Sequence, residues 1–67
     1  MDEAKIRSII KEVFKRNGLN PKNAIANIKL EDPNYIVVVT VLTSSELIEK
    51  LAKEIKAADM SMDVIVV

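Results

Sequence analysis

The stretch that decides the fold is "YIVVVTVL", residues 35–42, near the middle of the chain. A strand that separates a core from water alternates apolar and polar side chains, whereas Thr40 is the only polar interruption here after Tyr35. Both faces of this predicted strand are therefore apolar. Two arrangements explain such a strand: a central position covered on both sides, or a second face that another molecule keeps dry.

The preceding segment, residues 24–31, alternates apolar and polar side chains as a strand with one wet face does. Residues 32–34, Asp-Pro-Asn, then form a turn, because Pro33 fixes the backbone angle of a turn position. If the second and third of these residues are the turn centre, the resulting antiparallel hairpin places Leu30 opposite Val37. We therefore expect a hairpin with that register.

An amphipathic helix is predicted from Asp2 to Asn17, before the hairpin. Asp2 is placed to cap its start, Gly18 supplies the left-handed residue that ends it, and Leu19 is placed for the accompanying hydrophobic contact. Its apolar residues recur at the spacing of one helical stripe: Ile6, Ile9, Ile10, Val13 and Phe14.

A second helix is predicted to begin at Thr43, whose hydroxyl forms a capping box with Glu46, and to end near Asp59. Its predicted buried stripe is Leu47, Ile48, Leu51, Ala52, Ile55 and Ala58. Residues 60–67 close the chain as a strand. One face of that strand carries Met60, Met62, Val64 and Val66.

The element order is therefore α-β-β-α-β within a single domain, residues 1–67. A helix between the second and third strands predicts a parallel crossover, and the short turn predicts an antiparallel hairpin. We expect a two-layer α/β sandwich with a three-stranded mixed sheet and both helices on one face. This topology resembles a ferredoxin-like fold that lacks its first strand, a resemblance that carries no functional residue.

Composition excludes several kinds of site. The chain has no cysteine and no histidine, so it lacks a thiolate, the usual general base and the usual transition-metal ligands. Ser44 and Ser45 have no histidine to activate them, and their place at a helix start is explained by capping. We expect no enzyme activity, cofactor or metal, and a cytoplasmic or recombinant chain without a targeting signal or membrane contact.

The second face of the sheet is the strongest candidate for an interaction site. Exposed apolar patches larger than a few hundred Å² commonly mark interfaces, although β propensity alone also favours valine and isoleucine in a central strand. A homodimer through this face is one explanation. The candidate interface residues are Ile25, Ile36, Val38, Ile65 and Val67.

A basic cluster on the first helix is the other candidate. Residues 1–23 carry six basic and three acidic side chains, although the whole chain has no net charge. The cluster lacks the aromatic residues and glycine-rich loop of typical nucleic-acid binders, and cations also favour a helix C-terminus. The candidate phosphate-contacting residues are Arg7, Lys11, Lys15, Arg16 and Lys22.

Three hypotheses follow for the function. The first is an engineered or de novo designed stable domain without catalytic activity, because local signals agree in every segment. The second is a natural interaction or homo-oligomerisation module that uses the apolar sheet face. The third, ranked last, is a weak nucleic-acid binder that uses the basic cluster.

Overall fold

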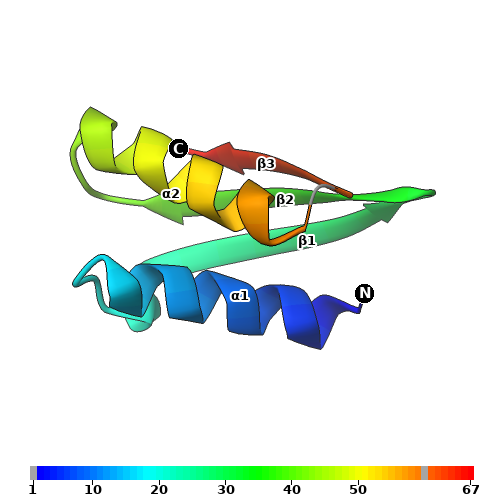
Figure 1. Ribbon diagram of the computed structural model, residues 1–67, viewed down its shortest axis with the longest axis horizontal. Helices are drawn as coiled ribbons and strands as arrows, with labels where there is room; N and C mark the ends of the chain where they lie inside the picture. The colour runs from blue at the N-terminus through cyan, green and yellow to red at the C-terminus, as the bar shows by residue number, and fades with distance from the viewer. Residues whose placement is uncertain (1, 60) are drawn as a thin grey trace.

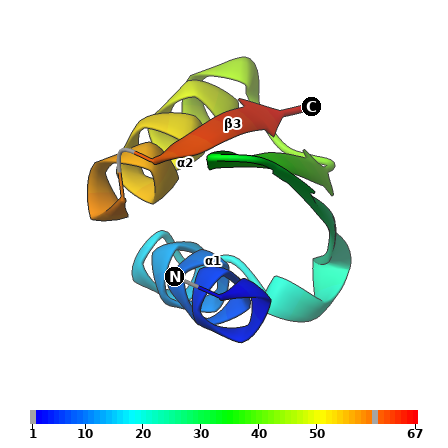
Figure 2. The ribbon, with the colours of Figure 1, turned by 90° about the vertical axis from the view of Figure 1, so that its right-hand side faces the viewer.

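The chain folds into a three-stranded mixed sheet with both helices on one of its faces (Figures 1 and 2). This computed structural model describes residues 2–59 and 61–67. The elements are α1 (Glu3–Arg16), the 3-10 helix η1 (Pro21–Asn23), β1 (Ala24–Glu31), β2 (Asn34–Val41), α2 (Ser45–Ala58) and β3 (Met62–Val66). The predicted fold class and the order α-β-β-α-β are confirmed.

β2 is the central strand, with β1 and β3 on either side. It pairs antiparallel with β1 and parallel with β3, as a short turn on one side and a helical crossover on the other require. Its side chains Val37, Val39 and Val41 are buried under the helices. Burial of these valines under the helices therefore explains the apolar character of one face of "YIVVVTVL".

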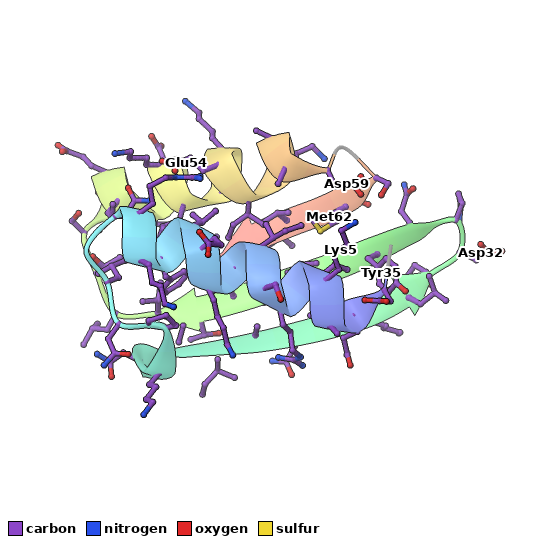
Figure 3. All side chains as sticks on the ribbon, turned by 60° about the horizontal axis from the view of Figure 1, so that its bottom comes forward. Lys5, Asp32, Tyr35, Glu54, Asp59 and Met62 are labelled. Carbon is purple, nitrogen blue, oxygen red and sulfur yellow. The ribbon has the colours of Figure 1, made fainter. Side chains whose placement is uncertain are left out.

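The register of the hairpin differs from the predicted one by two residues. Leu30 pairs with Tyr35, and Asp32 and Pro33 are the two residues between the paired ends of the strands. The peptide bond that joins them is cis, and Asp32 lies at the tip of the hairpin (Figure 3). Because side chains alternate with a period of two, a two-residue error keeps every side chain on its predicted face.

The core lies between the sheet and the two helices. Phe14 and Leu51 are fully buried there, as is Met62 on β3. Each apolar side chain of this size contributes roughly 1.5–3 kcal/mol when it leaves water. The buried residues are Ile6, Ile10, Val13, Phe14, Val37, Val39, Val41, Leu51, Ile55 and Met62.

Both ends of α1 are capped as predicted. Asp2 Oδ1 accepts a hydrogen bond of 2.8 Å from the Lys5 amide. Gly18 has a φ of 73°, a left-handed conformation that side chains disfavour, and the Leu19 amide donates to the Phe14 carbonyl at 2.9 Å. Leu19 also packs against the core, so this cap fixes where the chain leaves α1.

The predicted cap of α2 is wrong by one residue. Ser44 is the N-cap, and its hydroxyl accepts a hydrogen bond of 3.3 Å from the Leu47 amide. A capping box with Ser44 would need a polar side chain three residues later, and that residue is Leu47. The predicted capping box between Thr43 and Glu46 does not form, because Ser44 is the cap residue. At the other end Ala58 is exposed, contrary to the predicted buried stripe.

The last strand is shorter than predicted. β3 begins at Met62, and Ser61 lies in a turn in which the Asp59 carboxylate accepts hydrogen bonds from both its amide and its hydroxyl. Met62 is buried and Val64 and Val66 pack against the core, as predicted. The expectation for Met60 lies outside the described residues.

We expect Ser44→Ala to lower the free energy of unfolding by about 1 kcal/mol, because it removes the hydroxyl that accepts from the first turn of α2. Thr43→Ala, the matched control, should cost clearly less because Thr43 is not the cap residue. Urea unfolding followed by circular dichroism measures both. Equal losses in the two variants would contradict this assignment of the cap.

Candidate interaction surface

The side of the sheet that faces away from the helices, here called the open face, is the candidate site (Figure 2). Alternation along the strands places all five predicted interface residues on it. Hydrogen bonds of 2.9 Å from the Val67 amide to Val39 and from the Val41 amide to Val67 hold the last residue beside β2. The open face consists of Ile25, Asn27, Lys29, Glu31, Asn34, Ile36, Val38, Thr40, Asp63, Ile65 and Val67.

The apolar side chains of the open face are exposed to water. Ile25 is 66% exposed, Ile65 51% and Val67 56%. Ile36 and Val38 are partly buried because they lie on the central strand between neighbours. Leu42, directly after β2, is fully exposed at 100%. The second face of "YIVVVTVL" is therefore left uncovered by residues 2–59 and 61–67.

Apart from Glu31 and Asn34, which lie opposite each other at the hairpin end, the strand registers arrange the open face in three rows that run across the sheet. The first row carries a charge at each end, and the other two are mainly apolar. The rows are Lys29, Ile36 and Asp63; Asn27, Val38 and Ile65; and Ile25, Thr40 and Val67. Opposite charges thus lie on the two edge strands, at the same level of the sheet.

Both charges of the first row have exposed partners within the chain. Lys29 Nζ lies 3.1 Å from Glu31 Oε1, and Asp63 Oδ1 lies 3.8 Å from Lys56 Nζ. Lys56 Nζ also donates to the Met62 carbonyl at 2.8 Å. Exposed pairs of this kind contribute at most about 1 kcal/mol, so Lys29 and Asp63 stay available to other charges.

The structure divides the predicted basic cluster. Lys11, Lys15 and Lys22 line a groove of about 420 Å³ beside Asn20 and Pro21. Arg7 lies beside the neighbouring part of the groove and donates to the Ala26 carbonyl at 3.3 Å. Arg16 is directed elsewhere, to α2.

Glu54 of α2 holds Arg16, and the prediction from sequence missed this contact between the helices. Its Oε1 lies 2.9 Å from Arg16 Nη2 and accepts a second bond of 3.1 Å from Nε (Figure 3). Asn17 Nδ2 donates to the same oxygen at 3.3 Å, and Lys50 Nζ lies 4.0 Å from Oε2. These contacts, the Arg16 hydrogen bonds first, hold the pKa of Glu54 below its usual value although partial burial opposes them.

Asp59, at the C-terminal end of α2, is a second carboxylate with a lowered pKa. The Ser61 hydroxyl, at 2.7 Å, is the main cause, followed by the Ser61 amide at 2.8 Å. Lys5 lies at the same end of the molecule and adds a smaller effect through its charge (Figure 3). Since these bonds belong to a turn, we assign Asp59 a structural role.

The polar side chains among the described residues lie outside the buried core. Ser44 acts as a helix cap, and none of the buried side chains in residues 2–59 and 61–67 is polar or charged. Within the same part of the chain, no three acidic side chains come together as a metal site would need. Neither α1 nor α2 has the length and apolarity of a helix that crosses a membrane.

Comparisons of the chain with protein-family models, with curated proteins and with solved structures gave no match.

The pH dependence of stability tests the contact at Glu54. Because its pKa is lowered on folding, the charged form adds stability above the ordinary value of 4.5, and this is lost as the pH falls through the folded pKa. We expect Glu54→Gln to lower the free energy of unfolding at pH 7, and the difference from wild type to shrink between about pH 5 and pH 3. Urea unfolding across this range measures it.

Glu49→Gln, at an exposed position of the same helix, is the matched control. It should leave the difference between pH 7 and pH 3 close to that of wild type. A Glu54→Gln variant whose stability tracks wild type in parallel at every pH would contradict the role of the Arg16 contact.

Proposed function

We propose that this chain is an interaction module that associates with a second copy of itself through the open face. The single observation that carries the proposal is the set of three half-exposed apolar side chains, Ile25, Ile65 and Val67, on a face that no helix covers. Exposed apolar surface of this kind favours association because contact removes it from water. A second copy offers a surface of matching size and composition.

The size of the open face sets the strength of the association. Strands lie about 4.8 Å apart and rise roughly 3.3 Å per residue, so three strands of this length present on the order of 350 Å². This is below the roughly 800 Å² that each partner contributes to a standard interface. We therefore propose a weak dimer that forms at micromolar to millimolar concentration.

An engineered domain with no partner and no catalytic activity is the competing proposal. Its support is local consistency: the Asp2 and Gly18 caps and the buried apolar stripe all agree with the fold. The resemblance to a ferredoxin-like topology lacking the first strand fits both proposals, because it carries no functional residue. A domain of this kind stays monomeric at all concentrations, so the oligomeric state distinguishes the two.

The basic groove supports a second, weaker candidate, which is nucleic-acid binding. Lys11, Lys15 and Lys22 line one groove, so three phosphates of a single strand are within the reach of one site. No stacking side chain lines it. The expected affinity is therefore low and mainly electrostatic.

The groove is tested with a fluorescent single-stranded oligonucleotide. If three lysines contact phosphates, the logarithm of the binding constant should fall with the logarithm of the salt concentration with a slope of about −2. Lys11→Glu combined with Lys15→Glu should abolish the binding. Lys50→Glu combined with Lys53→Glu, on α2, is the matched control, and equal losses in both double variants would contradict a site in this groove.

Sedimentation equilibrium of wild type and Val38→Lys tests the proposed association. We expect the mass of wild type to rise toward that of a dimer between micromolar and near-millimolar concentration. Val38→Lys should stay monomeric because it places a charge at the middle of the open face. Ile65→Lys, on an edge strand and half exposed, should have the same effect at less risk to folding.

Leu30→Lys is the matched control, because Leu30 is exposed but lies on the helix side of β1. It should dimerise like wild type, and circular dichroism should show that all variants are folded. A wild type that stays monomeric up to near-millimolar concentration would overturn the proposal in favour of the domain without a partner.

A further inference from the structure

The rows of the open face determine how the second copy packs. The geometry points to a face-to-face dimer whose two-fold axis runs parallel to β2, with Lys29 of each copy against Asp63 of the other. This inference rests on the proposed function, since it concerns the same surface. It adds the orientation of the partner and the residues that select it.

A rotation about an axis along β2 exchanges the two edges of the sheet and keeps each row at its own level. β1 of one copy then lies over β3 of the other. Lys29 and Asp63 are in one row, with Ile36 between them, so the contact between Lys29 and Asp63 forms twice in the dimer. The arrangement therefore places opposite charges in contact at both ends of the first row.

The apolar side chains match under the same rotation. Ile36 and Val38 lie on the central strand, so each contacts the same residue of the second copy. Ile25 of one copy contacts Val67 of the other. Sheets that stack in this way keep their strands within about 30° of each other, so the rows stay aligned over three strands. The one mixed contact is that of Asn27 with Ile65.

Two-fold arrangements with the axis across the strands pair opposite charges only where the axis lies between Lys29 and Glu31, and that position leaves the two mainly apolar rows without a counterpart. An axis across the strands at the first row brings Lys29 onto Lys29 and Asp63 onto Asp63. The same axis at the second row places Lys29 against Ile25 and Asp63 against Val67. An orthogonal crossing of the sheets about an axis through Val38 brings either Lys29 or Asp63 onto the same residue of the other copy. Charge complementarity together with contact between the apolar rows thus selects the axis along β2.

Charge reversal at the two positions tests the arrangement. Lys29→Asp alone and Asp63→Lys alone each place like charges at both ends of the first row, so each should weaken the dimer about 10-fold at low salt. The double variant Lys29→Asp/Asp63→Lys restores opposite charges across the interface and should dimerise within about 2-fold of wild type. Sedimentation equilibrium measures all four proteins, and urea unfolding confirms that each is folded.

Two variants on the outer side of α2 control for net charge. Lys53→Asp and Glu49→Lys change the charge of the chain by the same amounts as the two single variants, but both positions are exposed on α2. They should change the dimerisation constant less than about 2-fold, because exposed charges farther apart than a Debye length are screened.

The outcomes separate this inference from the proposed function. Restoration by the double variant supports the axis along β2. A dimer that Val38→Lys abolishes, but whose single charge variants have no effect or whose double variant stays weak, overturns this arrangement and leaves association through the open face standing. A wild type that stays monomeric overturns both.

Discussion

The central position of β2 is the constraint on which the rest of the structure depends. Because β2 pairs with a strand on each side, its backbone N–H and C=O groups form their hydrogen bonds within the sheet. Other parts of the molecule can therefore pack on β2 only through its two faces. Both helices cover one face and bury Val37, Val39 and Val41. The other face keeps its valine and isoleucine side chains partly or largely exposed, which is where the functional proposal begins.

The helix layer is held together by apolar burial and by the polar contacts of Glu54. α2 packs on β3 and α1 packs beside α2, so the two helices share the burial of the sheet. Glu54 connects them by accepting hydrogen bonds from Arg16 and Asn17, at the point where the Gly18 cap ends α1. Arg16 therefore has a structural partner, whereas Lys11, Lys15 and Lys22 remain around the groove.

The candidate site was largely predictable because side-chain alternation needs no tertiary information. The five apolar residues of the open face follow from the parity of the strands, and even a register wrong by two residues kept them there. The place of Asp63 on the open face also follows from the alternation of side chains along its strand. Its place in the same row as Lys29 does not, because that depends on two registers at once. The contact of Glu54 with Arg16 was not predictable, since those residues are 38 positions apart.

The sequence by itself determined the order of the elements, the stripe of α1, the cap at Gly18 and the face to which each strand residue belongs, because these follow from local periodicity and local backbone chemistry. Only the tertiary structure decided the hairpin register, the cap of α2 at Ser44 and the contacts between the helices. These features depend on how separate segments fit against one core, where shifts of one or two residues change the local energy little but change the packing decisively.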